Sequence, residues 1–273
     1  MTILQAIILG IIQGLTEFLP VSSSAHLVFI PYLLGWEIPV QEAFIFDILV
    51  QVASLVAIIA YFWTDLIAIG HAWLTGLIQR KPFADTHARL GWLLILATIP
   101  AGLAGLLIKN LVEQAFASPV ATAAFMFVTA GMLTAAEYFS HPKREAEQLN
   151  WKDALWIGLA QAVAIFPGIS RSGATISGGM ARGLKRPAAA RFAFLMSIPI
   201  MLAAGLVASL DMVKISGVMS MLPVFIPGLV ASAIVSYFTI RWLLKYLTQR
   251  SLYIFALYCA SFGSIVLLFS LFR

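Results

Sequence analysis

Two short segments contain most of the residues in this chain that could do chemistry. The first begins at Gln13 and places a carboxylate, Glu17, four residues later, so that both side chains share one face of a helix. Pro20 would end that helix. In a second helix starting after it, Ser23 and His26 are three residues apart, so the hydroxyl and the imidazole can face each other as nucleophile and base.

The serines of this segment also suit an anion. Ser22, Ser23 and Ser24 lie where the second helix would begin, and the backbone N–H groups of a first helical turn have no intrahelical partner. Such an N-terminus binds anions. We therefore expect Ser22 and Ser24 to contact a phosphate group beside Ser23.

The second segment follows Pro167 and has Arg171 as its only charge. The planar guanidinium matches phosphate with two parallel hydrogen bonds. The neighbouring hydroxyl groups and glycines can add donors and let the backbone approach a ligand. We expect phosphate binding here by Arg171 and by three hydroxyl residues, Ser170, Ser172 and Thr175. A purely structural ion pair between Arg171 and Glu17 is the alternative.

Composition places both segments in a membrane protein. Hydrophobic residues make up 61% of the 273 residues and charged residues 11%, whereas soluble domains are about a quarter charged. A membrane-spanning helix needs roughly 20 apolar residues. Six runs meet this requirement and predict an all-α polytopic membrane protein with six transmembrane helices: 43–63, 90–108, 120–139, 188–210, 221–243 and 252–272.

The two chemical segments are too short and too broken to span. Each has a short apolar helix, a proline, a cluster of Ser and Gly, and a second short helix, which predicts re-entrant hairpins at 3–35 and 153–185. Non-helical backbone at membrane depth is tolerated only where protein or a wet cavity satisfies it. Both breaks should therefore be buried in protein.

The chain also resembles itself. The stretch 6–13 matches 154–161, and the proline and serines of the first break match those of the second. Each half would hold one hairpin and three spans, so the second half would enter the membrane upside down. We predict an inverted-topology repeat, 1–140 and 151–273, within one membrane domain, with the two breaks meeting near its centre.

Charge placement sets the expected orientation. The formal net charge is +5. Most Lys and Arg residues lie in four clusters, at 80–89, 143–152, 182–191 and 241–250. All four fall on one side in this topology, which predicts that this side is cytoplasmic and that both termini face outward. We expect a membrane and no nucleic acid as partner. The single cysteine, Cys259, excludes a disulfide or a thiolate metal site within one chain.

Two polar residues stand in the first span. Asp47 and Gln51 are four residues apart and share a helix face. Asp47 and Gln51 could support the site residues through hydrogen bonds, as we expect for Gln13, or they could be ordinary polar packing residues.

The motifs QGLTEFLPVSSSAH (13–26) and PGISRSGATISGG (167–179) resemble the two signatures of bacterial undecaprenyl-diphosphate phosphatases of the bacitracin-resistance type. The similarity covers essentially the whole chain. It implies an enzyme of the bacterial cytoplasmic (inner) membrane that removes the terminal phosphate of a C55 polyprenyl diphosphate and recycles the lipid carrier of cell-wall synthesis. It also implies an active site opening to the periplasmic face; a homodimer is left open.

The resemblance further implies a divalent cation, Mg²⁺ or Ca²⁺. The first position of the family motif accepts Glu or Gln and is Gln13 here, so a two-carboxylate metal site at 13 and 17 is excluded. Either Glu17, diphosphate oxygens and water hold the metal, or Glu17 is a base and the metal arrives with the substrate. His26 as the direct nucleophile is the rival to Ser23.

Two other functions compete with this interpretation. Secondary transporters also use inverted repeats with broken helices, but they would not need Ser23 to face His26. Lipid phosphatases of the acid-phosphatase type expect a His after the Ser-Arg pair, and no His follows Ser170-Arg171 in this sequence.

Overall fold

The computed structural model describes residues 1–108, 118–212, 215 and 217–272. Small parts of both predicted repeats, 1–140 and 151–273, therefore lie outside the described residues. The described chain is helical and has no β-strand. Six of its helices are long and apolar enough to cross a membrane, which confirms the predicted spans. They are α3 (Val40–Tyr61), α5 (Thr86–Leu107), α7 (Pro119–Phe139), α10 (Arg186–Met212), α11 (Val218–Tyr246) and α12 (Tyr253–Leu271).

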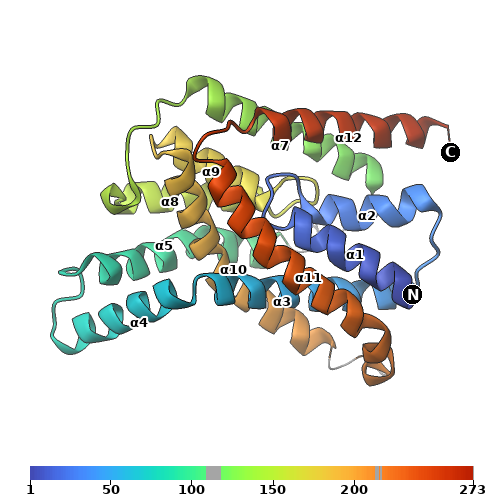
Figure 1. Cartoon of the computed structure of the whole chain (residues 1–273), viewed down its shortest axis with the longest axis horizontal. Helices are drawn as coiled ribbons and strands as arrows, with labels where there is room; N and C mark the ends of the chain where they lie inside the picture. Colours follow the sequence, from blue (N-terminus) through green and yellow to red (C-terminus); the bar gives the residue numbers. More distant parts are fainter. Residues whose placement is uncertain (109–117, 213–214, 216, 273) are drawn as a thin grey trace.

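Four shorter helices flank the two breaks: α1 (Ile3–Thr16), α2 (Ser23–Leu34), α8 (Trp151–Val163) and α9 (Arg171–Ala181). At 1.5 Å per residue none of them reaches the roughly 30 Å of a bilayer core. α1 begins and α2 ends on the side of the molecule that carries both termini, whereas α8 begins and α9 ends toward the opposite side (Figure 1). This arrangement suits two hairpins that enter from opposite sides. Their position in a bilayer and the inverted repeat stay predictions.

One helix was not predicted. α4 (Trp63–Ile78) follows α3 directly and forms a helical hairpin with α5 that extends away from the centre (Figure 1). Asp65 and His71 interrupt its apolar residues, so it contains no run long enough to signal a span. A single 3-10 turn, η1 (Ala146–Gln148), precedes α8.

The two halves exchange their short helices. α1 packs on α11, and α8 packs on α5. The contacts are backbone against backbone: a Cβ at Gly10 would lie 2.0 Å from the carbonyl oxygen of Gly228, and a Cβ at Gly158 would lie 2.4 Å from that of Ala97. Gly10 and Gly158 hold matching places in the two similar stretches. Each half therefore needs the other to bury its first helix.

An ionic cluster fixes the outer end of the second hairpin. The buried carboxylate of Asp153, in the first turn of α8, accepts hydrogen bonds from Arg144 (2.7 and 3.1 Å) and from Nε of Arg182 (2.8 Å). Burial alone would raise the pKa of Asp153, but these guanidinium groups outweigh it and hold the pKa below its usual range. The cluster ties the start of α8 to the turn between α9 and α10.

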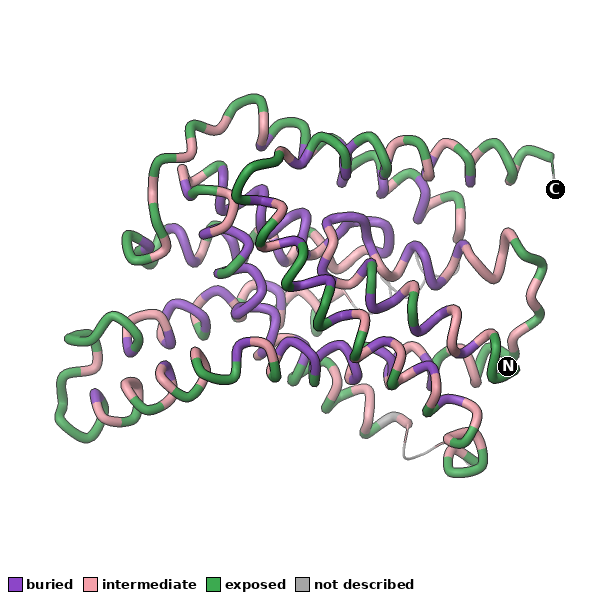
Figure 2. Tube along the Cα trace, in the orientation of Figure 1, coloured by how far each residue is buried: buried purple, intermediate pink, exposed green. Residues whose placement is uncertain are grey.

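The core lies where the helices cross. Figure 2 shows buried residues along the inner faces of the helices and around both breaks, while the outer faces are exposed. Many outward side chains are large and apolar, among them Leu202 (51% exposed) and Leu206 (65% exposed). This is the distribution expected when the surrounding solvent is lipid.

We predict that Gly10→Ala lowers the melting temperature in detergent. Alanine normally stabilises a helix interior by about 0.5–1 kcal/mol relative to glycine, but here the added methyl group collides with the backbone of α11. Gly70→Ala in α4 is the control, because a Cβ at that position meets nothing within 4 Å. Equal or higher stability of both variants would contradict the close α1–α11 contact.

Candidate active site

The two breaks lie against each other and are joined by three contacts. Nη2 of Arg171 donates to Oε1 of Glu17 at 2.6 Å. The backbone N–H of Gly168 donates to Oγ of Ser22 at 3.2 Å, and Oγ of Ser172 donates to the carbonyl oxygen of Leu19 at 2.8 Å. The predicted meeting of the two chemical segments is therefore present in the fold.

Glu17 is the centre of this contact. Its Oε2 accepts hydrogen bonds from Nε2 of Gln13 at 2.8 Å and from Oγ of Ser23 at 2.6 Å, while Oε1 binds Arg171. The side chains of Glu17 and Arg171 are only 8% and 21% exposed. One carboxylate thus holds the guanidinium in place and can accept a proton from the Ser23 hydroxyl.

A small polar pocket of about 170 Å³ opens beside these groups. Seven of the predicted site residues line it: Glu17, Ser22, Ser23, Ser24, Gln51, Ser170 and Arg171. Ser23 and Arg171 are the first helical residues of α2 and α9, so two helix N-termini begin at the pocket. First-turn N–H groups and the positive end of each helix dipole favour an anion there.

The other predicted residues lie around the pocket and do not line it. Oγ of Ser172 is used by the Leu19 carbonyl, and Oγ1 of Thr175 donates to the carbonyl oxygen of Arg171 at 2.8 Å. Both side chains are buried, so they stabilise the second break. Asp47 lies one turn before Gln51 on α3 and is outside the pocket lining.

The structure pairs Ser23 with Glu17 and turns His26 away. Nδ1 of His26 lies 2.8 Å from the carbonyl oxygen of Ser22, and Nε2 lies 2.7 Å from the hydroxyl of Tyr258. Because a carbonyl oxygen only accepts, Nδ1 carries the proton and Nε2 accepts from Tyr258. The ring also stacks on Phe262, 4.9 Å between centroids. Among the described residues, the expected contact between Ser23 and His26 is absent, because Tyr258 and Phe262 orient the imidazole away from Ser23.

Two further residues of the site escaped the sequence reasoning. Oγ1 of Thr129, on α7, donates to the carbonyl oxygen of Gly168 and accepts from the N–H of Ser170, both at 2.9 Å. A threonine inside an apolar span was a weak signal for it. Tyr258, on α12, gave no signal, because only the fold brings it to His26.

The first break is also conformationally unusual. Ser22 has a backbone φ of +67°, a value that residues other than Gly, Asn and Asp rarely adopt. The bonds from Gly168 to its hydroxyl and from His26 to its carbonyl hold it there. This turn places Ser23 at the edge of the pocket.

No cluster of three potential metal ligands among His, Cys, Asp and Glu occurs in the described ranges. Glu17 is the only carboxylate that lines the pocket. The donors fit a hard cation that shares one carboxylate, serine hydroxyl groups and the oxygens of a bound diphosphate, with water completing its shell.

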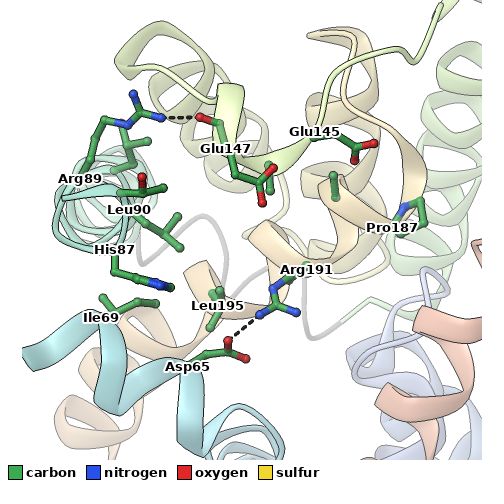
Figure 3. A pocket seen from close by; sticks show the side chains of 14 residues that line it. Asp65, Ile69, His87, Arg89, Leu90, Glu145, Glu147, Pro187, Arg191 and Leu195 are labelled. Carbon is green, nitrogen blue, oxygen red and sulfur yellow. Dashed lines mark hydrogen bonds and ion pairs between the residues drawn. The ribbon is translucent and has the colours of Figure 1, made fainter. Parts of the chain in front are cut away.

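A larger cavity of about 430 Å³ lies between α4, α5, η1 and α10 (Figure 3). It contains none of the predicted site residues. Its arginines are already engaged: Arg191 pairs with Asp65, and Arg89 donates to the carbonyl oxygen of Glu147.

Comparison with known proteins agrees with this geometry. The family model described as "Bacitracin resistance protein BacA" matches residues 6–265. A protein of Thermomicrobium roseum named "Undecaprenyl-diphosphatase" is 40% identical over 98% of both chains. Proteins of the same name from Chlorobium phaeovibrioides and Chloroherpeton thalassium are 40% and 41% identical over 98% of this chain and 97% and 96% of their own. The chain therefore belongs to the family of the bacitracin resistance protein BacA.

Proposed function

We propose that this protein is an undecaprenyl-diphosphatase that hydrolyses the terminal phosphate of a C55 prenyl diphosphate, recycles the cell-wall lipid carrier and confers resistance to bacitracin. The observation that carries the proposal is the 2.6 Å hydrogen bond from Oγ of Ser23 to Oε2 of Glu17 at the edge of a pocket that Arg171 also lines. A nucleophile, a base and a phosphate ligand are thereby within reach of one phosphoryl group.

In the proposed first step, Oγ of Ser23 attacks the terminal phosphorus and its proton passes to Glu17. The bond between that phosphorus and the bridging oxygen breaks, and the prenyl monophosphate leaves with the electron pair. Water then attacks the phosphoserine and releases inorganic phosphate. Arg171 and the N-termini of α2 and α9 stabilise the charge on the transferring phosphoryl oxygens.

His26 takes a positioning role in this scheme. Both ring nitrogens are engaged, by Ser22 and by Tyr258, and the ring does not line the pocket. Its hydrogen bond to the carbonyl oxygen of Ser22 stabilises the positive φ of that residue, and this turn places Ser23 at the pocket. The general base proposed here is Glu17, where the sequence had suggested His26.

A divalent cation, Mg²⁺ or Ca²⁺, would arrive with the substrate and be held by the diphosphate oxygens, because Glu17 acts as the base in this scheme. When bound it supplies charge neutralisation of the phosphate oxygens. The positive-inside rule supports placing the four Lys and Arg clusters at the cytoplasmic face of the bacterial inner membrane. We propose that the pocket opens to the periplasmic side.

The first test is phosphate release from undecaprenyl diphosphate by purified protein in detergent. We expect release without any second compartment, and its loss when a chelator is added and its recovery when Mg²⁺ is restored. Substrate binding without phosphate release would favour a transporter. Full activity in chelator would remove the cation from the scheme.

Arg171→Lys should lower turnover strongly although it keeps the positive charge. Lysine lacks the planar fork that can bind phosphate and Glu17 at once. Steady-state kinetics together with the melting temperature check this, since the fold should survive. Near-normal turnover would make Arg171 a structural counter-ion of Glu17.

Ser23→Ala should abolish turnover. Loss of one hydrogen bond to a charged group costs roughly 1.5–3 kcal/mol, about ten- to a hundred-fold in rate, and loss of a nucleophile costs far more. Ser24→Ala is the comparison: Ser24 lines the same pocket and bonds to Ser22 but not to Glu17, so its loss should cost no more than one hydrogen bond. His26→Ala should retain partial activity at all pH values. An inactive His26→Ala with a phosphoryl group trapped on the wild-type imidazole would transfer the nucleophile's role to His26.

A further inference from the structure

An apolar groove adjoins the polar pocket. It lies between α3 and α10, encloses about 130 Å³ and is lined by Ile48, Val52, Met201, Ala204, Gly205 and Ala208. Gln51 lines both the groove and the polar pocket. A ligand with a polar head and an apolar chain could therefore extend from one into the other past this residue.

Small residues of α10 create the groove. Ala204, Gly205 and Ala208 face α3 where larger side chains would close the space. A Cβ at Gly205 would meet Cγ2 of Val52 at 3.6 Å, an ordinary van der Waals contact. Helix packing therefore does not require a glycine here, and the open space is free for another occupant.

Gln51 is unusual at this junction. It is an exposed polar residue on a predicted membrane span and lines both the groove and the polar pocket. A phosphate oxygen next to the chain would satisfy the amide N–H groups.

We propose that the α3–α10 groove binds the isoprenoid chain of the substrate immediately next to the diphosphate, with Gln51 at the boundary between head and chain. The inference rests on the proposed function, in which the diphosphate occupies the polar pocket. The groove, with its volume of about 130 Å³, is far too small for a whole C55 chain. It holds the first few carbon atoms, and the rest of a C55 chain lies in the bilayer.

The groove acts by position. Lipid tails are as apolar as its walls, so moving a prenyl chain from the bilayer into it gains little from the hydrophobic effect. Holding the first isoprene unit fixes the direction of the diphosphate and brings the terminal phosphorus to Ser23. Such alignment is worth large factors in rate.

A second apolar hollow is the main rival. It lies between α7 and α12, measures about 830 Å³ and includes Gly131 and Leu257. None of its lining residues lines the polar pocket. Continuity with the pocket through Gln51 favours the smaller groove as the place for carbons bonded to the diphosphate.

Leucine substitutions separate the two hollows. Gly205→Leu should lower kcat/KM for undecaprenyl diphosphate by roughly ten-fold or more, and Gly205→Ala should lower it less. Gly131→Leu is the matched control: a Cβ there meets nothing within 4 Å, and the side chain would fill the rival hollow. Loss in Gly131→Leu with normal activity in Gly205→Leu overturns the proposal. An inactive wild-type protein would instead contradict the proposed function.

Cross-linking provides a readout that does not depend on how the variants fold. A prenyl diphosphate with a diazirine on its first isoprene unit is irradiated with Ser23→Ala protein, in which turnover is blocked. Mass spectrometry should find adducts within 48–52 and 201–208. Adducts at 130–139 or 253–260, or none within the groove while the diphosphate still protects the protein thermally, would overturn the assignment.

Discussion

A guanidinium and a carboxylate that are largely buried in an apolar bundle each need a charged partner, and in this protein they pair with one another. Glu17 and Arg171 are separated by 154 residues and come from two different breaks. Leaving either charge unpaired in the interior would cost more than most single contacts contribute. The ion pair therefore requires that both breaks meet, and the exchanged packing of α1 on α11 and α8 on α5 provides the frame in which they do.

The two breaks divide the chemistry between them. Ser23 and Arg171 both occupy the first helical position after a serine N-cap residue. In the proposed scheme this position carries the nucleophile in one half and the phosphate ligand in the other. Glu17 corresponds in the second half to Ile165, which also lines the pocket. The backbones at the two caps differ, with φ +67° at Ser22 and φ −68° at Ser170, and only Ser170 accepts a capping hydrogen bond with its side chain.

Most of the scaffold was readable from the sequence, because the length of an apolar run and the position of prolines are local properties. The six spans and the two breaks follow from them, and so does the shared face of Gln13 and Glu17. The helix α4 was not predicted, because its polar residues interrupt the apolar run.

The partner of Ser23 could not be predicted from spacing, since two candidates, Glu17 and His26, lie within reach of the same turn. Tyr258 and Phe262 decide between them by turning the imidazole away. Such contacts across the fold leave no periodic trace in a sequence.

The bond between His26 and Tyr258 has a consequence for the order of synthesis. These residues are 232 positions apart. At 5–20 residues per second, roughly ten to fifty seconds pass on the ribosome between the two. During that interval the first hairpin can insert, but Tyr258 has not yet been made. Nε2 of His26 therefore lacks its hydrogen bond, and only Nδ1 is bonded, to the carbonyl oxygen of Ser22. Delivery of α12 into the bilayer is therefore the event that completes the contacts around His26.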